Sequence, residues 1–214
     1  MAGTWLGNRV VTVMSETRPV LNRHCIVIDA GHGGVDGGAT SCSGVLESKI
    51  NLDIALRLQD VFHLLGYDTT MIRESDISVY TEGDTIAAKK VSDLKQRVKT
   101  VNGIDNALLV SIHQNFYHDS KYSGAQVFYA GNDESKMLAM QLQAKLVTVL
   151  NPGSKRQAKK ADGIYLMENI SCCGVLIECG FLSNAEEEYR LRNPDYQKQL
   201  SCVVAAVISN FLDQ

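Results

Sequence analysis

The sequence predicts a single α/β domain whose parallel strands form one sheet with helices on both faces. The main observation is that short apolar runs alternate with segments of helical periodicity along the whole chain. This alternation is typical of parallel sheets, because each crossover helix covers a face of the sheet. A second observation is that the chain has no internal repeat, low-complexity segment or linker. Nothing in the sequence therefore divides it into smaller units.

Each predicted element has its own local signal. A buried apolar run at 24–29 predicts the first strand, and a glycine-rich loop follows at 30–44. Ile50, Ile54 and Leu58 repeat at helical spacing and predict the first helix, which Gly66 can end. Further apolar runs predict strands at 67–72, 107–112, 125–129 and 174–178. Further helical patterns predict helices at 84–102, 134–150, 186–192 and 196–212.

The composition is that of an ordinary globular protein. With 214 residues, 45% of them hydrophobic, and a net charge of −3, the chain is not intrinsically disordered and lacks the basic surface needed for general nucleic-acid binding. No apolar run approaches the roughly 20 residues that a membrane span requires. The N-terminal segment lacks the basic and apolar regions of an intact signal peptide. Either the protein is cytoplasmic or an export segment is absent from this chain.

The six cysteines do not form a metal-binding pattern. No pair has the C-x-x-C spacing of thiolate zinc sites, so such a site is not expected. Cys25 and Cys202 lie in apolar runs, where we expect buried free thiols. Cys179 is expected to point into the core, because its side chain lies on the face opposite to that of its neighbour Glu178.

Candidate catalytic residues lie where the predicted strands end, which is where open α/β sheets bind their ligands. His32 stands in the glycine-rich loop after the first strand, and His113 follows the third strand. Glu178 closes the last apolar run, and Glu47 precedes the first helix, whose start faces the same edge. Two histidines and two glutamates at one edge match a catalytic zinc site. Such a site takes three protein ligands and leaves the remaining carboxylate to act as a base.

Each of these residues also has a simpler interpretation. His32 could be a surface histidine in a turn, His113 a buried hydrogen-bonded histidine, and Glu47 a favourable charge at a helix N-terminus. Glu178 is harder to explain in this way, because an ionised glutamate at the end of a buried run is costly unless it is paired or used. The glycine-rich loop could instead hold a phosphate, but it lacks the lysine and the glycine order of nucleotide-binding loops.

At these residues the sequence resembles the zinc-dependent N-acetylmuramoyl-L-alanine amidases of the amidase type 3 family. The resemblance runs from about Ile26 to Leu212, and its motifs occur in family order: DAGHGG, GVLESKINLDIALRL, LLVSIHQN and VLIECGFLSN. It implies a twisted, mostly parallel sheet of about six strands in a catalytic domain at 24–214, preceded by an N-terminal extension at 1–23. It also implies that three residues bind Zn²⁺, namely His32, Glu47 and His113, and that Glu178 is the catalytic glutamate.

A narrower resemblance, to the spore-cortex CwlD-type branch, rests on segments 71–76, 93–98, 123–126 and 164–169. Amidases of this branch strip stem peptides from the muramic acid of peptidoglycan in sporulating bacteria, before muramic-δ-lactam forms. The resemblance implies an exported, extracytoplasmic enzyme on the cell-wall or forespore-envelope side, whose signal or anchor segment is absent from this chain. It also implies a role in sporulation and germination, and it leaves room for a regulatory protein partner.

Two other functions remain open on the sequence alone. A related zinc carboxypeptidase would use a similar ligand set, but it needs an arginine pocket for a free carboxylate, and the sequence does not place one. A non-catalytic peptidoglycan-binding module would not need both histidines and both glutamates.

Several further residues have more than one interpretation. The segment from Lys155 to Lys160 carries four positive charges in six residues, and it is either a solvated loop or a contact for substrate carboxylates or a protein partner. Asp29 and Asp36 either orient metal ligands or serve strand-end and turn roles. Glycines 31, 33 and 34 are expected to leave room for the substrate backbone.

Overall fold

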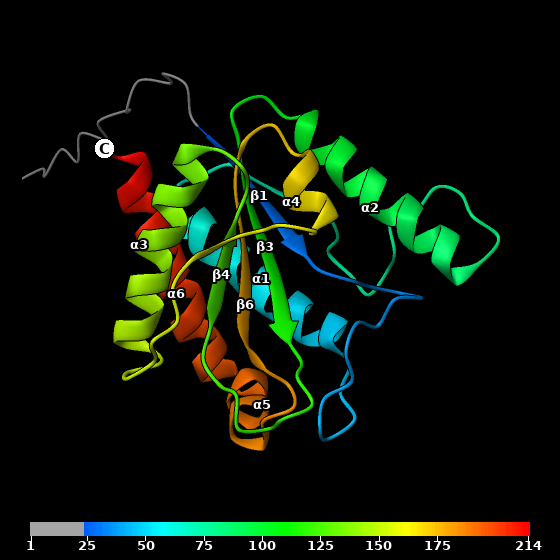
Figure 1. Cartoon of the computed structure of the whole chain (residues 1–214). Helices are drawn as coiled ribbons and strands as arrows, with labels where there is room; N and C mark the ends of the chain where they lie inside the picture. The colour runs from blue at the N-terminus through cyan, green and yellow to red at the C-terminus, as the bar shows by residue number, and fades with distance from the viewer. Residues whose placement is uncertain (1–23) are drawn as a thin grey trace, which may run out of the picture.

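Six strands form one sheet in the order β2-β1-β3-β6-β4-β5. Its central strands β1, β3, β6 and β4 are labelled in Figure 1. The computed structural model describes residues 24–214, so the predicted N-terminal extension at 1–23 lies outside the described residues. The predicted α/β class is confirmed. The strands are β1 (Cys25–Ala30), β2 (Thr69–Met71), β3 (Ala107–Asn115), β4 (Gln126–Tyr129), β5 (Lys159–Lys160) and β6 (Cys173–Phe181).

Helices α2, α3, α5 and α6 begin at polar side chains that accept hydrogen bonds from otherwise unpaired amides. Thr85 and Asn132 cap α2 and α3 in this way, and Asn193 caps α6. The five predicted helices are confirmed within a few residues at their ends, and the short α4 was not predicted. The helices are α1 (Glu47–Leu64), α2 (Ile86–Asn102), α3 (Asp133–Val149), α4 (Tyr165–Asn169), α5 (Ala185–Arg192) and α6 (Pro194–Leu212).

The predicted mostly parallel sheet of about six strands is confirmed, and one strand pair departs from the parallel arrangement that alternating strands and helices indicate. β1 pairs in parallel with β2 and β3, and β3 pairs in parallel with β6. β4 runs antiparallel to β6. The physical reason is that β3 and β4 are joined by a loop without a helix, and a parallel neighbour requires a crossover connection. β5, the two-residue strand in the basic segment, exists only through its pairing with β4.

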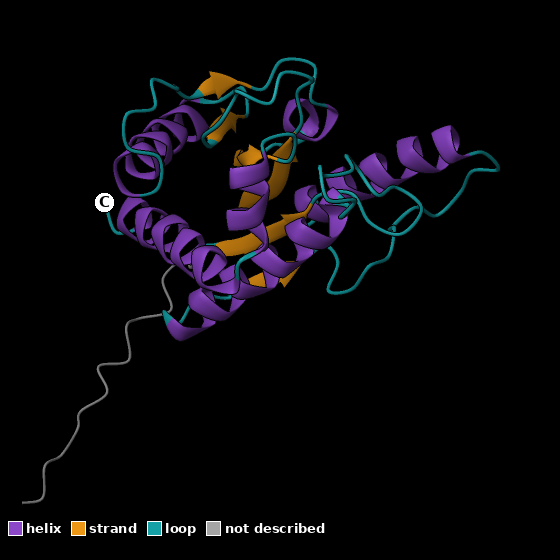
Figure 2. Cartoon of the chain, turned by 90° about the horizontal axis from the view of Figure 1, so that it is seen from below, coloured by secondary structure: helices purple, strands orange, loops and turns teal. Residues whose placement is uncertain are grey.

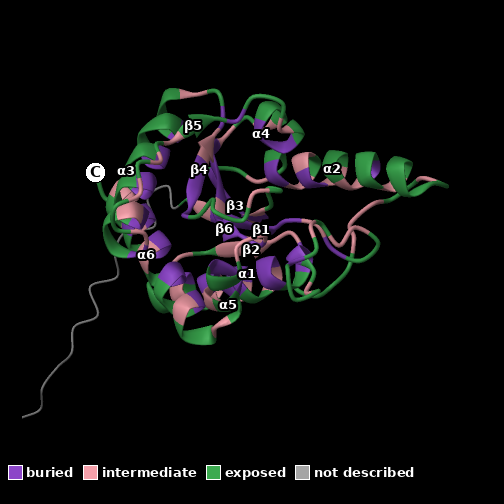
Figure 3. Cartoon of the chain, turned by 60° about the horizontal axis from the view of Figure 1, so that its bottom comes forward, coloured by how far each residue is buried: buried purple, intermediate pink, exposed green. Residues whose placement is uncertain are grey.

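Helices cover both faces of the sheet and divide the core into two parts. Helices α1, α3 and α6 pack on one face, where the larger buried cluster includes Ile54, Leu142 and Val204. Helices α2 and α4 lie on the other face over a smaller cluster that includes Val101 and Met167. Seen from below, the strands are enclosed by helices while α2 extends away from the sheet (Figure 2). The outer part of α2 is correspondingly exposed, and buried residues concentrate in the strands (Figure 3).

Strand alternation places the candidate residues on the α2/α4 face. Leu109 and Leu176 belong to the smaller cluster on that face. Successive side chains of a strand point to opposite faces, so His113, four residues after Leu109, and Glu178, two residues after Leu176, share it. Cys179 then points into the larger cluster on the opposite face, as predicted.

Two smaller observations complete the description of the domain. The prediction of a buried thiol at Cys202 is wrong, because Cys202 lies on the outer face of α6 and is exposed, and Cys25 is only partly buried. None of the helices within residues 24–214 combines the length and the apolar character that a membrane crossing demands.

Candidate metal centre

The fold brings the four predicted residues to one edge of the sheet. His32 lies two residues after β1, Glu47 is the first residue of α1, and His113 and Glu178 belong to β3 and β6. His113 and Glu178 stand directly side by side in the parallel β3–β6 pair. Both strands continue past these residues, to Asn115 and Phe181, so the strands are longer than predicted. Residues that are far apart in sequence therefore meet at the carboxyl ends of adjacent strands.

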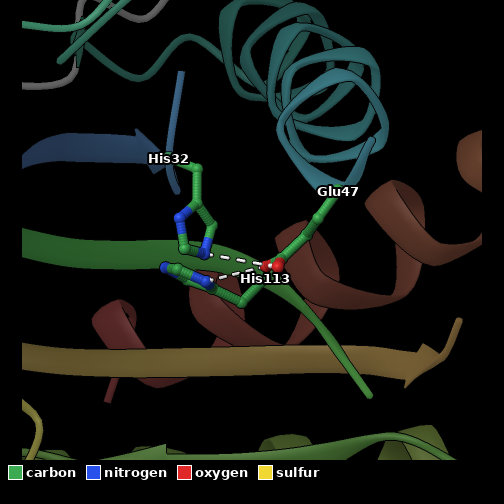
Figure 4. A group of neighbouring side chains, drawn as sticks. All are labelled: His32, Glu47 and His113. Carbon is green, nitrogen blue, oxygen red and sulfur yellow. Dashed lines mark hydrogen bonds and ion pairs between the residues drawn. The ribbon is translucent and has the colours of Figure 1, made fainter. Parts of the chain in front are cut away.

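His32, Glu47 and His113 point toward one another (Figure 4). Glu47 Oε2 lies 3.3 Å from His32 Nε2, and Glu47 Oε1 lies 3.1 Å from His113 Nδ1. One ligand atom from each residue lies within 4.8 Å of those of the other two. Two imidazoles and one carboxylate in this arrangement can hold a metal ion, and they are the donor types that a three-ligand catalytic site uses.

Glu178 is placed beside this cluster but takes no hydrogen bond from it. Its Oε2 atom is fully enclosed and has no hydrogen-bond partner. Burial raises the pKa of Glu178 to about 7, and the negative charge of Glu47 adds to the rise while His113 opposes it. A buried acceptor without a partner is unusual in folded proteins. Among the residues that the structure describes, one other buried side-chain polar atom lacks a hydrogen-bond partner, namely Gln114 Oε1. Gln114 adjoins His113.

The charges of the cluster are mutually stabilising. Burial by itself would lower the pKa of His32, but Glu47 and Asp36 outweigh that effect and raise the pKa to about 9. Burial would raise the pKa of Glu47, but His113 and His32 hold it well below its ordinary value. At neutral pH the imidazole of His32 therefore carries a positive charge that Glu47 and Asp36 stabilise.

Asp36 and Asp29 turn out to have different roles. Asp36 Oδ2 lies 3.0 Å from His32 Nδ1, and its other oxygen accepts a hydrogen bond from the Gly38 amide. Asp36 therefore both orients His32 and closes a turn, leaving Nε2 of the histidine to face Glu47. Asp29 does not contact the cluster. It is buried on β1, paired with Arg97 and hydrogen bonded to Ser111.

Two buried arginines hold the loop that carries His32, and sequence reasoning assigned them no role. His32 has a φ of 61°, a conformation that non-glycine residues rarely adopt. Arg97 donates to the His32 carbonyl at 2.7 Å. Arg73 donates through one nitrogen to both the Gly31 and the Ser48 carbonyls, and thereby ties this loop to the start of α1 beside Glu47. No local pattern identifies these arginines, because their partners lie 25 to 65 residues away.

Glycines 31 and 38 leave room for the side chains of the site, and the expectation that glycines 31, 33 and 34 leave room for the substrate backbone stays a prediction. A Cβ atom on Gly31 would lie 2.2 Å from the His113 ring. A Cβ atom on Gly38 would lie 2.5 Å from Glu47 Oε2. Glycines 33 and 34 pack against Ile77 and Ser78 in the same way. The loop is therefore glycine-rich because the side chains of the site and the neighbouring 77–78 segment approach its backbone closely.

Comparisons with known proteins agree with this geometry. Residues 26–210 match the N-acetylmuramoyl-L-alanine amidase family. The chain is 39% identical over 197 residues to the germination-specific N-acetylmuramoyl-L-alanine amidase of Bacillus subtilis, covering 91% of this chain and 82% of that protein.

Solved structures show the same likeness. The CwlD amidase from Clostridioides difficile, in complex with the GerS lipoprotein, superposes with a TM-score of 0.85 at 36% identity and covers 89% of this chain and 99% of its own. An N-acetylmuramoyl-L-alanine amidase from Clostridium difficile 630 has a TM-score of 0.78 at 27% identity, with 91% and 99% covered. Fold, site geometry and sequence similarity agree, and the chain belongs to the N-acetylmuramoyl-L-alanine amidase family.

Proposed function

We propose that this amidase hydrolyses the bond between muramic acid and L-alanine with a zinc ion held by His32, Glu47 and His113, and with Glu178 as the general base. One observation carries the proposal. Three ligand atoms of the kinds that zinc prefers lie within 4.8 Å of one another. The carboxylate of Glu178, with one oxygen that lacks a hydrogen-bond partner, belongs to the residue paired with His113 on the neighbouring strand.

The donor set fits zinc better than magnesium or calcium. Magnesium and calcium prefer oxygen ligands, whereas two of the three donors here are imidazole nitrogens. His32 is oriented by Asp36, as metal-bound histidines usually are by a carboxylate or carbonyl. Glu47 is held in place by the amides of Ala39 and Gln114. His32 and Glu47 are therefore held in place by groups outside the three-residue cluster.

The chemistry divides between the ion and Glu178. Bound zinc would polarise the scissile carbonyl and lower the pKa of a water molecule at the site toward ~7. Glu178 takes a proton from the attacking water through its free Oε2 atom, while the water oxygen bonds to the carbonyl carbon. The C–N bond then breaks, and Glu178 returns the proton to the leaving nitrogen of L-alanine. Burial of the Glu178 carboxyl, which raises its pKa, favours holding that proton between the two steps.

The relatives support a role in the spore cortex. One relative is named as germination-specific, and another was solved with a lipoprotein partner. We infer that this chain removes stem peptides from cortex peptidoglycan, which leaves bare muramic acid from which the δ-lactam can form. The enzyme then works on the extracytoplasmic, forespore-envelope side, where a lipoprotein partner could reach it. The family match gives no support to a carboxypeptidase or a non-catalytic binding module.

Digestion of purified peptidoglycan tests the bond that is cut. An amidase releases whole stem peptides with a free L-alanine amine and leaves glycan strands with bare muramic acid, and chelation should stop this reaction. Mass spectrometry of the products distinguishes the alternatives. New reducing sugar ends would refute the amidase assignment, since they come from a glycosidase. Trimmed stems that are still attached to muramic acid would instead indicate a carboxypeptidase.

The assignment of roles within the site has its own test. Glu178→Gln keeps the three ligands, so the protein should retain zinc while turnover falls at least ~100-fold, the usual scale for a general base. Loss of zinc in this variant would show that Glu178 is a ligand and that the proposed roles are wrong.

A further inference from the structure

A groove of about 1100 Å³ opens beside β4 and β5, and the mechanism above leaves it unused. Its walls come from the loop before β4, the end of α3, the segment leading into β5 and the start of α5. The volume is that of a site for a ligand of several residues. Neither the three-residue cluster nor Glu178 lines the groove.

Positive side chains predominate along this groove. Five of its lining residues are lysine or arginine and two are glutamate. One of these glutamates, Glu187, is buried and accepts hydrogen bonds from the amides of Gly124 and Phe181. Lys155 and Lys159 are exposed and form no ion pair with any residue in the part of the chain that the structure describes. Lys121 is paired with Asp119, but Lys155 and Lys159 add positive charge to the groove that no ion pair of the described residues compensates.

Arg156 is the most rigidly held of these basic residues. Its Nε donates to the Ser123 carbonyl at 2.8 Å, and its Nη1 lies 3.4 Å from Gln126 Oε1. Its guanidinium carbon lies 4.6 Å from the centre of the Phe181 ring. No carboxylate of residues 24–214 lies within ion-pair distance of it. A guanidinium fixed in this way loses little freedom when its remaining N–H groups bind a carboxylate.

A short path joins Arg156 to the proposed catalytic base. Gln126, which contacts Arg156, is the direct cross-strand partner of Glu178 in the antiparallel β4–β6 pair. Directly paired residues of two strands have their side chains on the same face. Phe181, under the guanidinium, follows Glu178 by three residues in β6. A substrate chain that leaves the catalytic centre therefore needs to cross only β4 to reach Arg156.

We propose that the groove binds the free carboxylates of the peptidoglycan stem peptide, with Arg156 as the principal contact and Lys155 and Lys159 as supporting charges. The inference rests on the amidase function proposed above. The scissile amide joins muramic acid to the first residue of the stem, so the rest of this anionic peptide leads away from the catalytic centre. Arg156 then recognises a carboxylate remote from the bond that is cut, and selects muramic acid that still carries its peptide.

Two matched soluble substrates test the proposal: a muramyl peptide with its stem carboxylates free, and the same compound with those carboxylates amidated. The zinc-loaded wild-type enzyme should prefer the free form in kcat/KM. Arg156→Met removes the charge but keeps an unbranched side chain over Phe181. It should lose roughly 10- to 100-fold in kcat/KM on the free form, mainly through KM, as expected for one charge-assisted hydrogen bond. Its rate on the amidated form should be unchanged.

Two further variants serve as checks. The double variant Lys155→Gln/Lys159→Gln changes only exposed side chains. Its kcat/KM on the free form should fall less than that of Arg156→Met. Added salt should lower the kcat/KM of the wild type in the same way, because salt screens exposed charges. Lys198→Gln removes an exposed charge of α6 that does not line the groove, and should have no effect. Melting temperatures show whether each variant is folded.

The outcomes separate this proposal from the proposed function. If the wild type cleaves neither substrate at the muramic acid–alanine bond, the amidase function has failed. The groove does not bind stem carboxylates if the wild type cleaves both forms equally well, or if Arg156→Met lowers kcat/KM by the same factor on both. The amidase function stands in either case. If the variants cleave both substrates normally but no longer bind a protein partner, the groove is a protein interface and the proposal is wrong.

Discussion

Glu178 should destabilise the metal-free protein at neutral pH, and replacing it should reveal by how much. Burial raises the pKa of Glu178 from 4.5 to about 7 in the folded protein. Between these two pH values the unfolded chain ionises the carboxyl while the folded protein keeps the proton. Folding then takes up a proton, so the free energy of unfolding falls as the pH rises through this window.

The magnitude follows from the two pKa values. A tenfold change in proton affinity corresponds to about 1.4 kcal/mol, so the difference between 4.5 and about 7 corresponds to about 3 kcal/mol at pH 8. Glutamine has nearly the same shape and no charge. Glu178→Gln should therefore match the wild type near pH 4 and exceed it by about 3 kcal/mol at pH 8. For a chain of this length that corresponds to a melting temperature about 6–12 °C higher.

The assay is urea unfolding of chelator-treated wild type and Glu178→Gln across pH 4 to 8. Comparing the two proteins at each pH cancels the titration of groups that Glu178 does not influence. Glu82→Gln, at an exposed position, is the matched control and should change stability by less than about 0.5 kcal/mol. Zinc should reduce the difference in unfolding free energy between Glu178→Gln and the wild type at pH 8, because a nearby cation stabilises the ionised carboxylate.

Two results would refute this reasoning. A stability gain of the same size at pH 4 and pH 8 would come from packing rather than from ionisation. A Gln variant that is less stable than the wild type at pH 8 would mean that the carboxylate has a partner in the folded protein.

Four further predictions concern the metal site and its support. Purified protein should bind about one zinc ion per chain, and His32→Ala or His113→Ala should lose most of it by elemental analysis; full retention in both would refute the site. Although burial opposes it, Glu47 and Asp36 raise the pKa of His32 to about 9, so zinc must displace a proton below that pH. Zinc affinity should fall about tenfold per pH unit from 8 to 6, and calorimetry in buffers of different ionisation enthalpy should detect the proton; a pH-independent affinity would contradict this. Arg97→Met leaves the buried carboxylate of Asp29 without its ion-pair partner and should lower the free energy of unfolding, measured in urea, by about 3–5 kcal/mol. Arg57→Met, at a partly exposed position, should lower it far less. Gly31→Ala should displace the His113 ring and lower zinc affinity, which a competing chromophoric chelator can measure; unchanged affinity would show that the ring can move aside.

The local sequence determined the strands that form the centre of the sheet. β1, β3 and β6 are buried on both faces, so each is a continuous apolar run that can be recognised without knowledge of its neighbours. Three of the four candidate site residues could be predicted from the same runs. Parallel strands end at a common edge, and His32, His113 and Glu178 each stand at or near the end of such a run.

Only the tertiary structure decided how the outer part of the sheet is built. β4 is antiparallel because no crossover helix precedes it, and β5 is too short to have a pattern of its own. The basic segment therefore became one wall of a groove rather than a free loop. Strand order depends on which edges remain available for pairing, and residue periodicity does not contain that information.

The support of the site was likewise decided by tertiary structure. Arg73 and Arg97 act on carbonyl groups of distant segments, and a carbonyl is present in every residue, so no residue type marks the partner in advance. The pKa of Glu178 depends on burial by neighbouring elements rather than on the residues beside it in sequence. The sequence alone determined which side chains can do the chemistry. The enclosure that leaves one carboxylate oxygen without a partner arises only when the strands and helices pack, because desolvation is a property of the assembled fold.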